Sequence, residues 1–154
     1  MLIEVVAILV SVVLMAAVCG SEIGVGTVLT SLLDFPSLIS LLVLSLPILL
    51  RNGMWKDFVR GFKLLKKSYT CSLAELKRAL DVVELMQRQI LYAGVILTAF
   101  AIIIVLGFLQ KPEIVGVNIA VALITVLYAA VLEMLLLPVQ IEVKRRIIDY
   151  MEAE

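Results

Sequence analysis

Four long apolar stretches, separated by polar segments, dominate the pattern of the chain. They cover residues 2–19, 32–50, 89–109 and 114–139. Each is near or above the length of roughly 20 residues that a helix needs to cross the core of a bilayer. The second stretch is the weakest, because it begins beside Asp34 and contains Pro36 and Pro47. The pattern predicts an all-α membrane protein with four transmembrane helices, organised as one membrane domain over residues 1–154.

The segment between the second and third stretches, residues 51–88, has a different pattern. Apolar side chains recur at intervals of three and four from Trp55 to Tyr69, while Lys56, Arg60 and Lys63 occupy the opposite side. This spacing predicts a basic amphipathic helix that lies along the membrane surface or packs on its neighbours. Its basic face has two interpretations, one in which it only sets topology and one in which it binds lipid.

The third apolar stretch continues a helix that begins well before it. Ser72 and Glu75 have the spacing of a capping box, which marks a helix start. We therefore expect one helix from Leu73 to about Leu109. At 1.5 Å per residue it exceeds the bilayer core of about 30 Å, so its first turns project from the membrane.

The last helix is also expected to overshoot the membrane, continuing through Pro138 into the tail, residues 140–154. The apolar faces of the two projecting segments then cover each other, with Ile147 and Ile148 opposite residues 76–83. Glu84 and Arg88 have the spacing of a favourable i,i+4 pair on the third helix. The third and fourth helices are thus predicted to extend into the cytoplasm.

Composition and charge agree with a membrane location. The chain is 63% hydrophobic and has a mean hydropathy of +1.15, whereas soluble domains are about half apolar. Nine of its 13 Lys and Arg lie between Arg51 and Arg88. The positive-inside rule therefore places this segment, the tail and both termini in the cytoplasm. Cys19 and Cys71 then lie on opposite sides of the membrane, which excludes a disulfide between them.

Motifs of enzyme chemistry are missing from the sequence. It has no His, no CxxC, no Gly-rich loop followed by Lys and no nucleophile elbow. We expect no catalytic residues, no metal and no cofactor. Lys and Arg are abundant only in the cytoplasmic stretch and are not interleaved with aromatic residues on a soluble sheet, so we expect no nucleic-acid partner.

One face of the fourth stretch carries small and polar residues at helical spacing. These are Asn118, Ala122, Thr125, Ala129 and Glu133. Glu133 is the only ionisable side chain placed well inside a predicted span, where a carboxylate normally faces protein or water and has a function. The stripe is interpreted as an ion pathway or a partner-facing surface. The alternative is helix packing, with the Thr hydroxyls bonded to their own backbone.

The third stretch has a matching face, on which Gly94 and Thr98 lie with Ala101. Small residues let helices approach closely, and hydroxyls can bond across the interface. Two such faces on adjacent antiparallel helices favour a lined path or a docking groove over packing alone. Glu133 has an alternative role as an ion pair with Arg88, which lies near the same cytoplasmic level.

Four short motifs follow one another in order along nearly the whole chain. They are LDFPSL at 33–38, FVRGFK at 58–63, GVILT at 94–98 and AVALITVLYA at 120–129. In this order they resemble the D-x-P-S-L, post-span, G-M-I-G-T and A-V-A-L-L-T-T-L-Y-G segments of flagellar stator proteins. The chain is thus similar to the MotA/TolQ/ExbB ion-channel family, closest to a MotA-like stator protein with a shortened cytoplasmic region.

The resemblance implies a homo-oligomeric ring in a bacterial cytoplasmic (inner) membrane. In the family, five subunits surround two helices of a single-span partner that carries an essential intramembrane Asp. Proton or sodium flow past that Asp is thought to drive rotation of the ring. Thr98 and Thr125 would fall on the face that lines the ion path, so the implied function is a subunit of an ion-driven membrane motor or channel.

Several departures from the family pattern support a second interpretation. Leu91 stands where the family has Pro, Val126 where it has a second Thr, and Ala129 where it has Gly. Glu133 falls about where the family tends to carry Asn. The lost Pro and Gly positions, which in the family would allow the helices to rearrange, motivate the alternative of a non-conducting membrane scaffold that keeps the ring architecture. In a third interpretation, Glu133 itself takes up and releases the ion.

Overall fold

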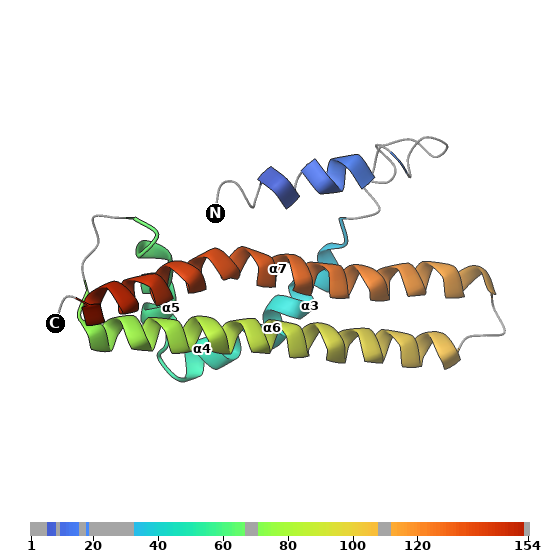
Figure 1. Ribbon diagram of the computed structural model, residues 1–154. Helices are drawn as coiled ribbons and strands as arrows, with labels where there is room; N and C mark the ends of the chain where they lie inside the picture. The colour runs from blue at the N-terminus through green and yellow to red at the C-terminus, as the bar shows by residue number, and fades with distance from the viewer. Residues whose placement is uncertain are drawn as a thin grey trace.

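Two long antiparallel helices form the body of the protein (Figure 1). They are α6 (Leu73–Gly107) and α7 (Pro112–Glu152). Three shorter helices pack on them, α3 (Phe35–Ser45), α4 (Pro47–Arg51) and α5 (Trp55–Lys63), of which α4 does so through the buried side chain of Leu49. The computed structural model describes residues 6–8, 10–15, 18, 33–66, 71–107 and 112–152, and these residues contain no strand. The predicted all-α fold is confirmed.

The long helices start and continue as the sequence predicts. The backbone N–H of Glu75 donates to Ser72 Oγ over 3.4 Å, and the backbone N–H of Ser72 donates to Glu75 Oε2 over 3.1 Å, which completes the capping box. Helix α7 continues through Pro138. With 35 and 41 residues, the helices are roughly 50 and 60 Å long. Both exceed a bilayer core of about 30 Å, as predicted.

Small residues allow α6 and α7 to approach closely. A Cβ atom placed on Gly94 would lie 2.5 Å from the Cβ of Ala129. One turn away, Thr98 Oγ1 donates to the carbonyl oxygen of Ala122 across the interface, over 3.3 Å. These contacts set an antiparallel register in which Arg88 and Glu133 lie at nearly the same height and line one pocket.

The register also indicates where a membrane would surround the hairpin. Residues 89–107 of α6 and 115–132 of α7 contain no charged side chain. These two runs are about 27–29 Å long, which matches the bilayer core. We call the level of Arg88 and Glu133 the border, and the part beyond it, residues 73–88 and 133–152, the charged extension. With the membrane placed at this level, Glu133 lies at the end of the uncharged run, whereas the sequence analysis places it well inside a span that extends to residue 139.

Two of the four predicted spans correspond to α6 and α7, which are long and apolar enough to cross a membrane. The second stretch is divided at Pro47 into α3 and α4, and α5 turns away from their direction by 105°. By length and composition it counts only as a broken span or a re-entrant segment. In the first stretch, helical residues lie within Val6–Met15, whereas Cys19 lies outside the described residues.

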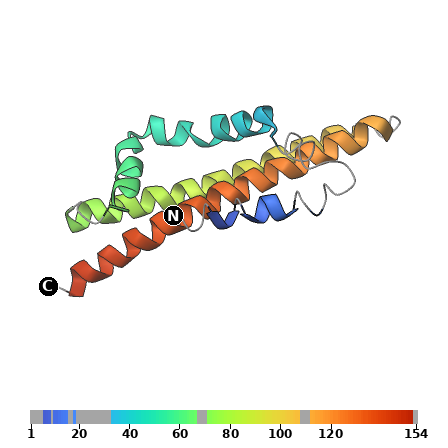
Figure 2. The ribbon, with the colours of Figure 1, turned by 90° about the horizontal axis from the view of Figure 1, so that it is seen from above.

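The second stretch lies closer to the border than a helix that crosses the whole membrane would. The backbone N–H of Asp34, just before α3, donates to the hydroxyl of Tyr128 over 2.8 Å. Tyr128 is only five residues from Glu133, or about 7 Å along α7. Further along, Gln89 Nε2 at the border donates to the carbonyl oxygen of Leu44 over 3.4 Å. Helices α3 and α4 thus run beside the middle of the hairpin, around the border (Figure 2).

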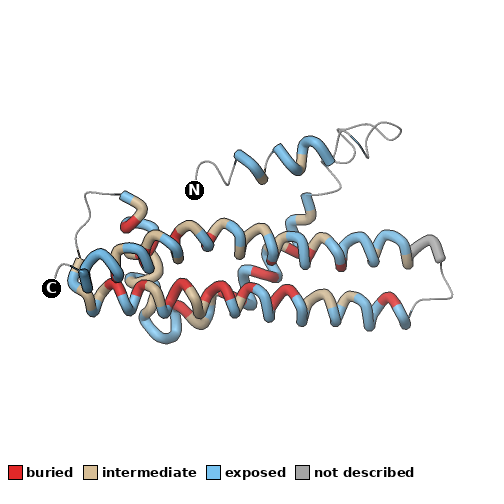
Figure 3. Tube along the Cα trace, in the orientation of Figure 1, coloured by how far each residue is buried: buried red, intermediate tan, exposed pale blue. Residues whose placement is uncertain are grey.

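Buried residues concentrate on the inner sides of the hairpin and at its contacts with the short helices (Figure 3). A first cluster of apolar side chains joins α3 and α4 to the hairpin around the border. A second cluster holds the charged extension together, as predicted, although Ile148 is 51% exposed and does not take part. Its members are Leu64, Leu76, Ala79, Val83, Val139, Val143 and Ile147.

The amphipathic helix predicted from Trp55 to Tyr69 is shorter in the structure. Helix α5 ends at Lys63, and residues 67–70 lie outside the described part of the chain. A Cβ atom on Gly61 would lie 3.1 Å from Val83 Cγ2 and 3.3 Å from Val139 Cγ1. Helix α5 therefore packs across both long helices, which is one of the two predicted arrangements.

We predict that Gly94→Ala destabilises the hairpin by about 1–3 kcal/mol, because the added methyl group overlaps Ala129. The measurement is the free energy of unfolding in detergent, obtained by titration with a denaturing detergent. Gly116→Ala is the matched control in α7, since a Cβ there meets nothing within 4 Å, and it should be neutral or slightly stabilising. Equal effects at both positions would contradict the close approach.

Candidate functional site

The small and polar stripe of α7 faces α6 within the chain. Ala122, Thr125 and Ala129 are 1%, 4% and 2% exposed, and Gly94 is buried opposite them, with Thr98 half-buried beside it. We call these five residues the seam. The structure thus brings together the candidate residues of both predicted faces, and it does so inside the hairpin of a single chain.

Both seam hydroxyls donate hydrogen bonds within the hairpin. Thr125 Oγ1 donates to the carbonyl oxygen of Val121 in its own helix over 3.1 Å. Thr98 Oγ1 donates across the interface to Ala122. The back-bonding proposed as an alternative from the sequence is therefore seen for Thr125. Each hydroxyl oxygen still has acceptor capacity, which is the property a passing cation or proton donor would use.

The two ends of the predicted stripe lie in different surroundings. Asn118 and Glu133 are both half-buried, but 15 residues of helix separate them, which is about 22 Å. Asn118 lies near the start of α7, whereas Glu133 lies at the border. The seam occupies the interval between them.

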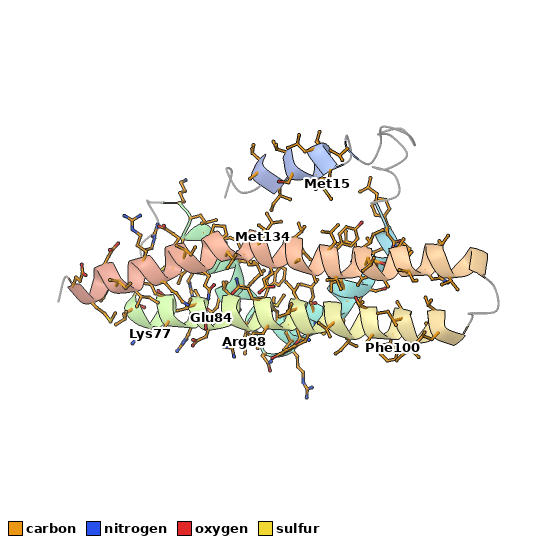
Figure 4. All side chains as sticks on the ribbon, turned by 45° about the vertical axis from the view of Figure 1, so that its right-hand side comes forward. Met15, Lys77, Glu84, Arg88, Phe100 and Met134 are labelled. Carbon is orange, nitrogen blue, oxygen red and sulfur yellow. The ribbon has the colours of Figure 1, made fainter. Side chains whose placement is uncertain are left out.

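A polar pocket of about 250 Å³ opens at the border, directly after the seam. We call it the border pocket. Its lining consists of Glu84, Gln87, Arg88, Leu91, Glu133 and Gln140. Helix α6 supplies four of these residues and α7 supplies two, and Glu84 and Arg88 lie one turn apart on α6 (Figure 4). Polar groups from both long helices therefore converge where the apolar runs end.

Glu84 is bound by α7 and not by its neighbour on α6. Its Oε1 accepts a hydrogen bond from Gln140 Nε2 over 2.9 Å and pairs with Lys144 Nζ, also over 2.9 Å. The i,i+4 pair with Arg88 that the spacing predicts does not form an ion pair among the described residues. The reason is the hairpin register, which brings Lys144 and Gln140 within reach of the same carboxylate.

Glu133 and Arg88 share the border pocket without forming the predicted ion pair in the part of the chain that the structure describes. In the same pocket, Gln87 is 7% exposed, and its Nε2 has no hydrogen-bond partner among the described residues. An unsatisfied buried amide costs about 1–3 kcal/mol. The pocket thus combines two opposite charges with an unpaired donor. Among the described residues, no group of three His, Cys, Asp or Glu could hold a metal ion.

Gln87 is the site residue that the sequence analysis missed. It lies four residues after Val83 and three before Ile90, both of which are buried. A polar residue at helical spacing within an apolar face is the signal that could have found it. Gln87 lies two residues before the third apolar stretch, so hydropathy alone does not mark it.

No protein-family model, curated protein or solved structure matches the chain. The resemblance to the MotA/TolQ/ExbB family therefore rests on the four motifs and their order.

We predict that the stabilising effect of Glu84 depends on pH. The hydrogen bond from Lys144, followed by that from Gln140, lowers the pKa of the Glu84 carboxyl from its ordinary value of 4.5. A lowered pKa stabilises the folded chain above the unfolded value, and the contribution is lost as pH falls through the folded value. Glu84→Gln should therefore lower the Tm in detergent at pH 7, and the difference should disappear at acid pH.

The effect of Glu84→Gln should stay below about 1 kcal/mol, because the Lys144 side chain is 50% exposed and solvent screens the pair. Asp81→Asn is the matched control, since Asp81 is an exposed carboxylate on the same helix with no ion pair among the described residues. A difference between wild type and Glu84→Gln that persists unchanged at pH 3 would refute the assigned cause.

Proposed function

We propose that this chain is a subunit of a proton- or sodium-driven membrane ion motor or channel of the MotA/TolQ/ExbB type. Several copies form a ring around a single-span partner with an intramembrane Asp. The chain then lies in a bacterial cytoplasmic membrane with four spans, the second of them broken at Pro47, and both termini and the charged extension are cytoplasmic. The order of the four sequence motifs and the overshooting hairpin support this proposal.

The border pocket is the observation that carries the proposal. An ion that leaves an apolar span needs polar groups where the span ends, and the pocket offers Glu133, Arg88 and Gln87 at that level. A hairpin built only for packing would be more stable with an apolar residue in place of the unpaired Gln87 amide. Buried polar groups left without partners call for an explanation, and a binding or transport role supplies one.

The outer half of the hairpin leaves room for neighbouring helices. In the most apolar part of each long helix, only 22% of the residues are buried within the chain, so the others are available to contact lipid or further helices. Phe100, for example, is 61% exposed and points away from α7 (Figure 4). This exposure is compatible with a ring of copies around a partner.

A second candidate function is a non-conducting scaffold that keeps the ring. It is favoured by the hydrogen bonds of the seam, because Thr98 and Thr125 both donate their hydroxyl protons inside the hairpin. In this function the seam is packing alone, and Gln87 binds a residue of another subunit.

Ion flux separates the two functions. The complex, isolated with its single-span partner and placed in vesicles, should dissipate an imposed proton or sodium gradient. Gln87→Leu and Thr125→Val should each lower the flux about tenfold, equivalent to about 1.4 kcal/mol in the barrier. Gln89→Leu is the matched control, because Gln89 is a second glutamine of α6 that contacts α3 outside the border pocket.

A wild-type complex that keeps its partner but holds the gradient would establish the scaffold. Undiminished flux in both Gln87→Leu and Thr125→Val would reject the assigned pathway even if the complex conducts. The mass of the intact complex, with five copies expected, tests the ring separately from the flux.

A further inference from the structure

Helix α5 lies at the depth at which lipid headgroups would surround the hairpin. Gly61 packs against Val83 and Val139 in the charged extension. Val83 is five residues beyond Arg88, or about 7 Å past the border. The headgroup layer of a bilayer occupies about 5–8 Å on each side of the core. Helix α5 also turns by 105° from the α3–α4 direction, so it runs across the hairpin at that depth (Figure 2).

One face of α5 forms a basic groove of about 320 Å³, which contains Lys56, Arg60 and Lys63 beside Trp55. Arg60 forms ion pairs with Asp57 and, over 3.0 Å, with Glu75. Lys56 and Lys63 are exposed, and neither forms an ion pair within the described residues. The groove therefore presents two uncompensated ammonium groups at headgroup depth, where cations attract anionic lipids.

An apolar groove of about 350 Å³ lies on the other side of α5. All its lining side chains are apolar, and they come from α5, both long helices and the α3–α4 segment. Phe58 and Phe62 form its end at headgroup depth, whereas Leu132 and Ile90 lie on the membrane side of the border. The groove thus runs from headgroup depth to the edge of the hydrocarbon layer, where the acyl chain of a phospholipid begins.

A row of aromatic rings joins the two grooves. Trp55 lines the basic groove, and its ring centroid lies 6.1 Å from that of Phe58, which lines the apolar groove. Phe58 in turn contacts Phe62 edge-on, with centroids 5.2 Å apart. Trp is the residue typical of the interface between headgroups and hydrocarbon. The lysines, the Trp55 ring and the apolar groove therefore follow one another in the same order as the phosphate, the glycerol region and the acyl chain of a phospholipid.

We propose that α5 binds one anionic phospholipid, with its phosphate on the face of Lys56 and Lys63 and an acyl chain in the groove behind Phe58 and Phe62. The charge of the basic groove selects an anionic headgroup, and the depth of both grooves selects a lipid over a soluble anion. This site needs neither ion flow nor a partner protein, so it stands independently of the proposed function.

The test uses the full chain in neutral detergent and counts bound lipid by native mass spectrometry. Wild type should retain a long-chain phosphatidylglycerol in preference to a phosphatidylcholine with the same chains. Removing both ammonium groups in Lys56→Gln/Lys63→Gln should weaken phosphatidylglycerol binding roughly 30-fold, from about 1 kcal/mol for each lysine. Lys56→Arg/Lys63→Arg should keep it.

The matched control is Lys77→Gln/Arg145→Gln, which removes two exposed cations of the charged extension that form no ion pair among the described residues. It should leave phosphatidylglycerol binding unchanged. An equal loss of phosphatidylglycerol binding in this control would show that the lipid is attracted by the overall positive charge and not by a specific site, and would overturn the proposal. Equal binding of phosphatidylcholine, or of wild type and Lys56→Gln/Lys63→Gln, would overturn it as well.

Two further arms test the lipid itself. Glycerol phosphate should not compete with the phospholipid, and competition at similar concentrations would show an anion site in place of a lipid site. A short-chain phosphatidylglycerol should bind more weakly than the long-chain form. Equal affinity for both would remove the acyl chain from the apolar groove.

Discussion

The contact between Gly94 and Ala129 determines the arrangement of most of the chain. Within a bilayer, helices gain little from hiding apolar surface from each other, because lipid tails are equally apolar. Close backbone approach over small residues is what holds such a pair in one register. That register puts Arg88 beside Glu133, brings Lys144 to Glu84, and aligns the apolar side chains that bury Ile147 beyond the border.

How much could be predicted from the sequence depended on whether a feature is local. The start of α6 at Leu73, its length and the passage of α7 through Pro138 follow from periodicity and capping, which act within a few turns. The position of α3 along the hairpin could not be predicted in this way. Hydropathy measures the composition of a segment and not where that segment lies along a neighbouring helix. The partner of Glu84 also eluded prediction, since Lys144 lies 60 positions away and only the register brings the two together.

The candidate site divides into a dry part and a wet part. The seam holds small side chains that are largely buried and hydroxyls that donate within the hairpin, so it leaves little room for water. The border pocket holds charges and an unpaired amide, so it can accept water or a partner group. An ion that passes both the seam and the border pocket must follow the outside of the seam, or α6 and α7 must separate locally. Leu91 and Ala129, which replace Pro and Gly of the family pattern, affect how readily the two helices separate.

The continuous course of α6 and α7 through the border has a mechanical consequence. No loop interrupts either helix there, and the cluster around Val83 and Val143 joins the two projecting ends into one lever. The lever arm beyond the border is about 25–30 Å long. A tilt of the membrane part by about 10° would therefore carry the far end through about 5 Å, comparable to one turn of helix. A small tilt of the helices within the lipid is thus amplified into a displacement at the far end of the charged extension that is large enough to move a bound neighbouring molecule.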